Sequence, residues 1–219
     1  MAFDFTSRPP RLRKSDCLFR SDLPNEPGGH TSLGSDPDAY TLGYRSAAEH
    51  LSKYALAHPH ECGSLAYPIF FLYRHHIELA LKRIIYWVPW VLRRDLTDQE
   101  KKNLGNHQLE RLWADLEPIF GSICEAVSWS KPEVDDLEGI REYVRQLSAI
   151  DPLSINFRYW KSKKGQPSLP DCIKSFNIRH FSEMMGRLAD FIEALGTATA
   201  AAGEMRDDLD EANCVDNLY

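Results

Sequence analysis

The amino-acid sequence predicts an all-α protein, an up-and-down bundle of four or five helices. Five segments repeat apolar residues with the 3.6-residue period of an amphipathic helix. No segment alternates apolar and polar residues over the length of an ordinary strand. Hydrophobic residues make up 43% of the 219 residues, which is enough to build a core.

The predicted helices lie at residues 40–57, 68–88, 106–123, 132–147 and 175–195. The second has the widest apolar coverage, so we expect it to be the central, most buried helix. It begins at Pro68, a residue suited to a first helical turn, and Pro89 ends or bends it. Residues 93–105 form a polar link with room for a short helix.

The two ends of the chain differ from this helical middle. Residues 1–38 contain five prolines and a group of arginines and lysines, which predicts an extended or flexible basic arm. Residues 200–219 are rich in Asp and Glu, which predicts a disordered acidic tail. The helical domain is therefore expected at residues 39–199.

Charge and cysteine usage restrict the class of protein. A net charge of −6 argues against broad nonspecific capture of nucleic acid, although a local basic groove is compatible with it. Five scattered cysteines without CxxC spacing predict free thiols in a reducing compartment. The longest apolar run, residues 67–92, is interrupted by six charged or histidine side chains, so we expect a cytoplasmic protein without a membrane span.

Neither a cofactor nor a metal is expected. The sequence contains no glycine-rich phosphate loop and no dinucleotide fingerprint. His58, His60 and Cys62 offer zinc-ligand side chains, but their spacing fits no zinc site.

Three short stretches, in order and with fitting spacing, together resemble the HEPN superfamily of helical domains. They are Arg-His-His-Ile-Glu-Leu-Ala-Leu-Lys at 74–82, His-Gln-Leu-Glu-Arg-Leu at 107–112, and Asn-Phe-Arg-Tyr at 156–159. The resemblance covers residues 40–196 and leaves both ends unexplained.

The resemblance implies a fold and a chemistry. Many members of that superfamily are metal-independent ribonucleases or toxins, paired with a nucleotidyltransferase antitoxin or found in phage-defence systems, while others only bind. Active members carry an Arg and a His separated by four to six residues. The Arg and His of two protomers meet at the dimer interface and promote attack of a ribose 2′-hydroxyl on the adjacent phosphate. A homodimer, an RNA or nucleotide ligand, and an antitoxin or defence partner protein are the implied partners.

This chain departs from that pattern where the catalytic His is expected. After four, five or six intervening residues beyond Arg158 the chain has Lys163, Lys164 and Gly165, and Tyr159 is followed by Trp160, where the family has Pro. Two functions therefore stay open: a ribonuclease toxin or defence component, and a non-catalytic HEPN-like module that binds a protein partner or nucleotide. A helical scaffold with an accidental likeness is a third.

Arg158 is the first candidate for the site. Its guanidinium could hold a phosphate bidentately, with Lys163 nearby, while Tyr159 or Trp160 stacks on a base. The plainer alternative is a loop arginine that pairs with Asp151.

His107 is the second catalytic candidate, because imidazole transfers protons near neutral pH; its plainer role is a hydrogen bond to a backbone carbonyl. Arg74, Glu78 and Lys82 stand four residues apart on one helix edge. They predict either a ladder of intrahelical ion pairs or a polar stripe in which Arg74 and Glu78 bind the ligand.

Overall fold

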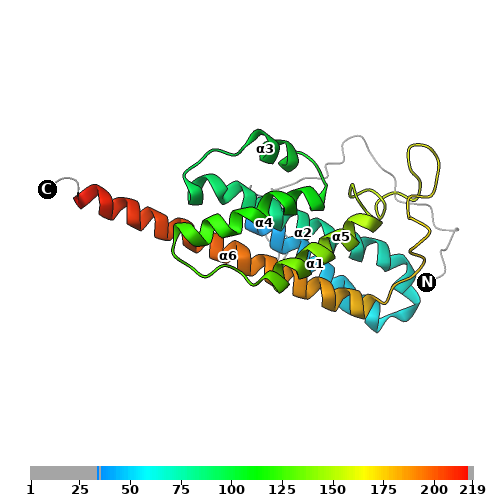
Figure 1. Cartoon of the computed structure of the whole chain (residues 1–219). Helices are drawn as coiled ribbons and strands as arrows, with labels where there is room; N and C mark the ends of the chain where they lie inside the picture. The colour runs from blue at the N-terminus through cyan, green and yellow to red at the C-terminus, as the bar shows by residue number, and fades with distance from the viewer. Residues whose placement is uncertain (1–33, 35, 217–219) are drawn as a thin grey trace, which may run out of the picture. The chain divides into compact units, whose positions relative to one another are not determined.

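The computed structural model describes residue 34 and residues 36–216, which form an all-α helical bundle with no strand (Figure 1). Its elements are α1 (Pro37–Ala57), the short 3-10 helix η1 (Pro59–Glu61), α2 (Cys62–Leu92), α3 (Asp98–Leu104), α4 (Leu109–Ala126), α5 (Val134–Ile150) and α6 (Ile178–Asp216). The all-α prediction is confirmed. The described residues contain six α-helices, where the sequence predicts four or five and leaves room for a short one at residues 93–105.

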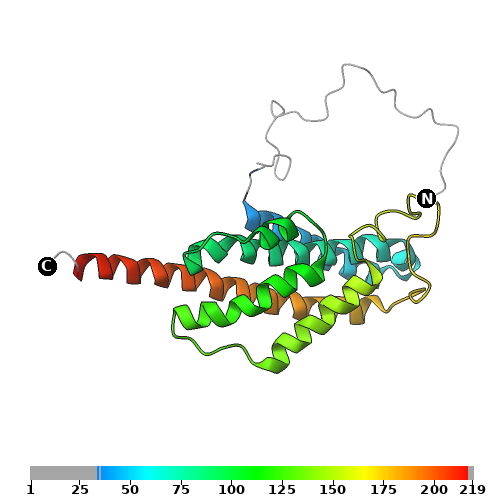
Figure 2. The same cartoon turned by 45° about the horizontal axis from the view of Figure 1, so that its top comes forward.

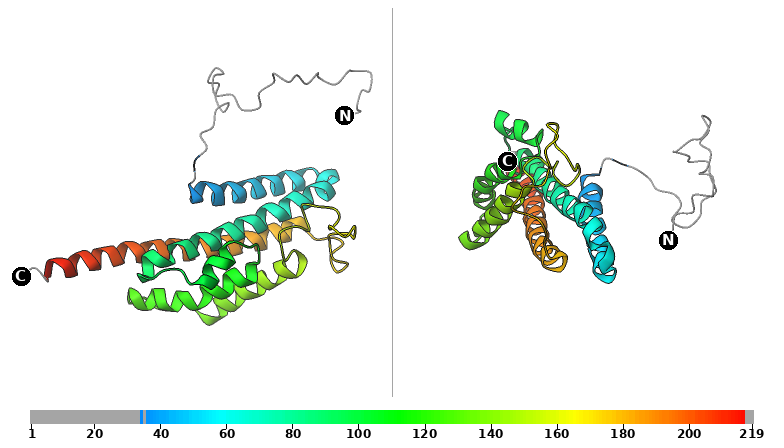
Figure 3. Two further views of the ribbon diagram at one scale, coloured as in Figure 1. Left: turned by 90° about the horizontal axis from the view of Figure 1, so that it is seen from above. Right: turned by 90° about the vertical axis from the view of Figure 1, so that its right-hand side faces the viewer.

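Helix α2 is the centre of the bundle, as its apolar sequence predicts. It packs against α1, α4 and α6, and α5 packs on α4 (Figure 3). Seven of its aliphatic side chains have no exposed surface: Ile69, Ile77, Leu81, Ile84, Ile85, Val88 and Val91. Full burial of one such side chain contributes roughly 1.5–3 kcal/mol, so α2 supplies much of the driving force for folding.

Both ends of α2 lie beyond the predicted limits. The helix begins at Cys62, six residues before Pro68, and continues past Pro89 to Leu92. Each proline removes one backbone hydrogen bond. The neighbouring Ile69 and Val91 are fully buried, and we attribute the continuity of the helix to this tertiary packing. The helix ends at Arg93, which adopts a left-handed backbone conformation with φ of 51°.

The polar link after α2 contains the additional helix, α3. Thr97 and Glu100 form a capping box, in which the Thr97 Oγ1 accepts from the Glu100 N–H and the Glu100 carboxylate accepts from the Thr97 N–H at 2.6 Å. Arg94 pairs with Glu100 at 2.7 Å, and this hydrogen bond lowers the pKa of Glu100 to about 2. These local contacts stabilise a helix of only seven residues.

The prediction of a disordered tail from residue 200 is wrong for residues 200–216, which continue α6 as helix (Figure 1). The alanines between residues 198 and 202 are strong helix formers. The acidic side chains that suggested disorder bind the end of α2: Arg93 contacts Asp207 at 2.6 Å and Asp210 at 2.8 Å, and the Trp90 Nε1 donates to Asp207 at 3.0 Å.

The long connection between α5 and α6, residues 151–177, lies at the end of the bundle opposite to the C-terminal part of α6 (Figure 2). Phe157 anchors it by stacking on Phe70 of α2, with ring centroids 3.7 Å apart. Cys62, Cys124 and Cys172 are free thiols, as predicted. The sequence predicts a basic arm at residues 1–38. Residues 1–33 and 35 of this arm lie outside the described residues, and residues 37 and 38 belong to α1.

Packing between α2 and the extended part of α6 gives a stability prediction. A Cβ atom at Gly203 would lie 2.6 Å from atoms of the Trp90 ring, whereas a Cβ at Gly186, also in α6, meets no neighbouring atom within 4 Å. We expect Gly203→Ala to lower the free energy of unfolding by about 1–3 kcal/mol because of overpacking. Gly186→Ala should raise it by about 0.5–1 kcal/mol through helix propensity. Urea denaturation of both variants measures this, and equal stabilisation by the two would contradict the packing of α6 on Trp90.

Candidate functional site

A buried ion-pair ladder runs along one edge of α2, as the four-residue spacing predicts. The Arg74 Nη1 lies 3.0 Å from the Glu78 Oε2, and the Lys82 Nζ lies 2.9 Å from the Glu78 Oε1. Arg74 and Glu78 are buried, whereas the side chain of Lys82 is 16% exposed. The sequence leaves open whether Arg74 and Glu78 form an ion-pair ladder or bind a ligand; their ion pair and their burial agree with the ladder.

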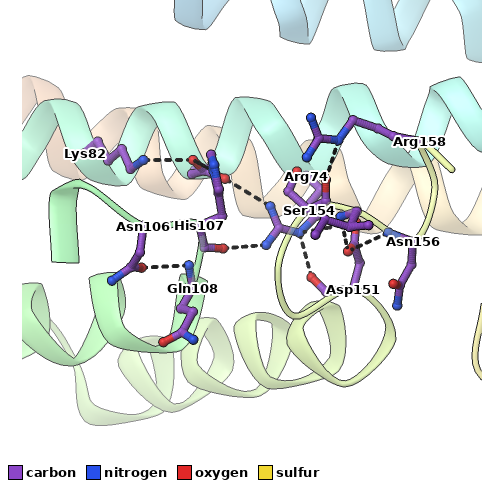
Figure 4. A network of polar contacts seen from close by, with 11 residues as sticks. Arg74, Lys82, Asn106, His107, Gln108, Asp151, Ser154, Asn156 and Arg158 are labelled. Atoms are coloured by element: carbon purple, nitrogen blue, oxygen red, sulfur yellow. Dashed lines mark hydrogen bonds and ion pairs between the residues drawn. The ribbon is translucent and has the colours of Figure 1, made fainter. Parts of the chain in front are cut away.

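His107 is the exposed group that this ladder supports. Its Nδ1 lies 2.8 Å from the Glu78 Oε1, and its side chain is 51% exposed. It precedes α4, where the Asn106 Oδ1 accepts a hydrogen bond from the Gln108 N–H at 2.9 Å. Figure 4 shows His107 beside Lys82 and Arg74, so the structure brings together two of the three stretches that carry the family resemblance.

Glu78 determines which His107 nitrogen carries the proton. Burial by itself raises the pKa of Glu78, but the hydrogen bonds from Lys82 and His107 outweigh it, and the net pKa is lowered. An ionised carboxylate only accepts hydrogen bonds, so the His107 Nδ1 must donate. The neutral imidazole then has its Nε2 free as an acceptor, which is the form that a general base requires.

Arg74 joins the His107 segment to the α5–α6 connection. Its Nη2 donates to the His107 carbonyl at 2.7 Å and its Nε donates to the Asp151 carbonyl at 2.9 Å (Figure 4). Burial lowers the pKa of Arg74, and the nearby charges of Asp151 and Glu78 oppose that shift. The guanidinium therefore contacts three separate segments of the chain and no solvent.

Asp151 is a residue of this network that the sequence does not assign to the site. It is buried, and its Oδ1 accepts from the backbone N–H groups of Ile155 at 2.7 Å and Asn156 at 3.1 Å. Its Oδ2 lies 3.7 Å from the Arg74 Nε, so its ion-pair partner is Arg74. The sequence instead suggests Arg158 as the partner. The available signal is an Asp at a helix end followed by Pro152, a pattern typical of turn initiation by a side-chain carboxylate.

Arg158 projects from the segment that Asp151 shapes. Its Nε donates to the carbonyl of Ser154, a residue with a left-handed φ of 58°. Its Cζ lies 5.5 Å from the ring centroid of Phe71 on α2 and 5.6 Å from that of Tyr159. Within the described part of the chain, the two Nη groups of Arg158 have no hydrogen bond or ion pair. The side chain of Arg158 is exposed, so an anion can approach it from solvent.

The remaining predicted binding residues lie on a short hairpin beyond Arg158. A bridge between Lys161 and Pro167 closes it, and the Ser162 N–H donates to the Gln166 carbonyl at 2.8 Å. Trp160 is 82% exposed, with the Lys161 Nζ 4.6 Å from its ring centroid. Tyr159 and Lys163 are also exposed. No described contact joins Lys163 to the network of α2.

A hollow of about 420 Å³ opens between this hairpin and the start of α2. Its lining comprises Tyr67, Asn156, Phe157, Arg158, Tyr159, Trp160, Pro167 and Leu169. A second hollow of about 370 Å³, on the side of Cys62 and Ile173, shares the Tyr67, Phe157 and Leu169 walls. The site therefore combines a positioned histidine, an exposed guanidinium and an aromatic cavity.

The Glu78 carboxylate gives a prediction on stability and pH. Because its folded pKa is below the ordinary 4.5, its stabilisation is present above that pH and is lost as the pH falls through the folded value. Glu78→Gln should lower the free energy of unfolding by about 3–5 kcal/mol at pH 7, since it leaves Arg74 buried without its carboxylate.

Urea denaturation between pH 7 and pH 3 measures this difference, which should shrink towards the acid end. Glu142→Gln is the matched control, because it removes a carboxylate that pairs with Arg145 on the exposed face of α5. It should change stability little. A Glu78→Gln variant as stable as this control would contradict the buried network.

Comparisons with known proteins leave the site to be interpreted from its own geometry. No protein-family model, curated protein or solved structure matches this chain. Residues 34 and 36–216 contain no cluster of three His, Cys, Asp or Glu side chains suited to a metal ion. In the same residues no helix has both the length and the apolar composition needed to cross a bilayer.

Proposed function

We propose that this chain is a HEPN-like domain that binds RNA through Arg158 and cleaves it without a metal ion, with His107 as the group that accepts the proton. The observation that carries the proposal is the pairing of a half-exposed His107 with the buried carboxylate of Glu78. A surface histidine needs no buried anion for stability, but a general base needs a fixed tautomer and orientation.

The edge of α2 supports both functional groups. Phe71 lies beneath Arg158, and Glu78 lies beneath His107. These two residues are seven positions apart, about 10 Å along a helix with a 1.5 Å rise per residue. At about 3.4 Å per stacked nucleotide, this length corresponds to roughly three nucleotides of one strand. Arg158 therefore suits a phosphate near the reacting one rather than the reacting phosphate itself.

Lys82 is a cation that shares one carboxylate oxygen of Glu78 with His107. Both side chains contact the same oxygen, Glu78 Oε1, at 2.9 Å and 2.8 Å. An ammonium group in this position stabilises negative charge that develops on a phosphate. The proposed site thus consists of His107 for proton transfer, Lys82 for the charge of the reacting phosphate, and Arg158 for binding.

The proposed reaction needs no further reagent than water. The His107 Nε2 takes the proton of a ribose 2′-hydroxyl, whose oxygen forms a bond to the adjacent phosphorus. The bond from phosphorus to the 5′ oxygen breaks, and that oxygen takes a proton from water. The products are a 2′,3′-cyclic phosphate and a 5′-hydroxyl end, and the imidazolium returns its proton to solvent.

Binding without cleavage is the second candidate function. It is favoured by the residues that follow Arg158, since Lys163 and Lys164 occupy positions where active members of the family have His. Lysine binds phosphate but is protonated at neutral pH and is a poor base there. The homodimer and the antitoxin or defence partner rest on the family resemblance and stay predictions.

Cleavage of a defined RNA oligonucleotide in EDTA tests the proposal. We expect His107→Ala to slow cleavage by about 10²–10⁴-fold, the usual contribution of a general base. Binding of the same sequence with 2′-O-methyl groups, which cannot be cleaved, should persist in this variant. Arg158→Ala should weaken both binding and cleavage.

His50→Ala and Arg145→Ala are matched controls, because both side chains are exposed on α1 and α5 and should leave both activities unchanged. Binding that Arg158→Ala weakens, with no cleavage by the unmodified protein, would assign the chain to the non-catalytic function. Neither binding nor cleavage of RNA by the folded protein would reject both RNA functions and leave the module that binds a protein partner.

A further inference from the structure

The hollow beside Arg158 has the size and lining of a site for a flat aromatic ligand. Its volume of about 420 Å³ falls within the range of small-molecule sites. Three different parts of the chain supply aromatic rings to it. Tyr67 comes from α2, Phe157 from the α5–α6 connection where it stacks on Phe70, and Tyr159 and Trp160 from the segment that leads into the hairpin. Neither the ion-pair ladder nor His107 lines this hollow.

Three of these four rings retain much exposed surface. Trp160 is 82% exposed, Tyr159 56% and Tyr67 47%. Exposed aromatic faces grouped around one hollow are unusual on a protein surface unless something binds there. Stacking with a ligand would bury this apolar area and would use the edge groups of Tyr and Trp as polar contacts.

The hollow is held open by contacts that need no ligand. Phe157 stacks on Phe70 with ring centroids 3.7 Å apart, and Asp151 fixes the preceding turn. The Ser168 N–H donates to the Trp160 carbonyl at 3.3 Å and closes the base of the hairpin. A preformed site avoids much of the entropy cost of ordering its walls when a ligand binds.

The charge around the hollow selects an anionic ligand. Residues 157–170 contain Arg158 and three lysines, at 161, 163 and 164, and no Asp or Glu, although the whole chain has a net charge of −6. Arg158 lines the hollow, and its Nη groups have no hydrogen bond among residues 34 and 36–216. A ligand that joins a flat ring to a phosphate would satisfy the rings and the guanidinium together.

We propose that this hollow receives one unpaired nucleobase of a single-stranded nucleic acid, the phosphate beside that base being bound by Arg158. This inference rests on the proposed function and adds the class of substrate. A base within a duplex is covered on both faces by its stacked neighbours, and it must leave the stack before it can enter a pocket. The hollow therefore selects single strands, loops and ends over duplex.

Binding of one 2′-O-methyl oligonucleotide, alone and annealed to its complement, tests the inference at fixed salt. We expect the full chain to bind the single strand at least tenfold more tightly than the duplex. Trp160→Ala and Tyr67→Ala should each weaken single-strand binding by roughly 5- to 150-fold, the usual effect of removing a ring on which a base stacks. Trp160→Phe should restore most of the loss.

Trp129→Ala and Tyr86→Ala are the matched controls, since both rings are exposed outside the hollow and should not change binding. The nucleobase site is rejected if the protein binds single strand and duplex with equal affinity and neither Trp160→Ala nor Tyr67→Ala lowers the affinity for the single strand. Sensitivity to Arg158→Ala in that same experiment would leave the proposed function standing. If the protein binds neither form of RNA, the inference and the proposed function both fail.

Discussion

A guanidinium without access to water needs an acceptor on each of its sides, and this requirement at Arg74 organises the site. Its acceptors are the Glu78 carboxylate and the carbonyl groups of His107 and Asp151. Taking an ion out of water costs several kcal/mol, so the fold keeps this charge only while all three partners stay in place. The middle of α2, the start of α4 and the turn after α5 therefore position one another.

The properties of the exposed groups follow from this buried contact. Glu78 stays ionised beneath the surface and determines the tautomer of His107. Asp151, held beside Arg74, shapes the turn from which Arg158 extends. The side chains offered to a ligand are thus carried by segments whose backbones are fixed from below. We regard this division between a buried support and exposed reactive groups as the central feature of the site.

The sequence predicts most of the helices but few of their ends. Apolar periodicity locates α1, α2, α4, α5 and α6, because it reports which face of each helix is buried. Apolar periodicity cannot show that α2 continues past Pro68 and Pro89, because this continuity depends on tertiary packing. The acidic composition after residue 200 predicts disorder. That prediction fails because composition does not reveal that Arg93 and Trp90 of the α2 end contact Asp207.

The candidate site was predictable in its membership more than in its geometry. The four-residue spacing of Arg74, Glu78 and Lys82 predicts their ion pairs, since local contacts on a helix follow from spacing alone. The contact between Glu78 and His107, 29 residues apart, depends on how α4 packs on α2. The burial of Arg74 depends on the packing of α4 and of the turn after α5 against α2, and although the Asp-Pro pair indicates a turn at Asp151, it does not show that this turn contacts Arg74.

The two long-range bonds of Arg74 to carbonyl groups bear on how this protein could change during evolution. Every residue has a backbone carbonyl, so an exchange of the side chain at position 107 leaves the bond to that carbonyl available. The buried network therefore tolerates replacement of the side chain at position 107, because its bond to that residue uses the backbone alone. Position 107 is thus open to substitution at little cost to the fold, whereas Arg74 itself would be far harder to replace.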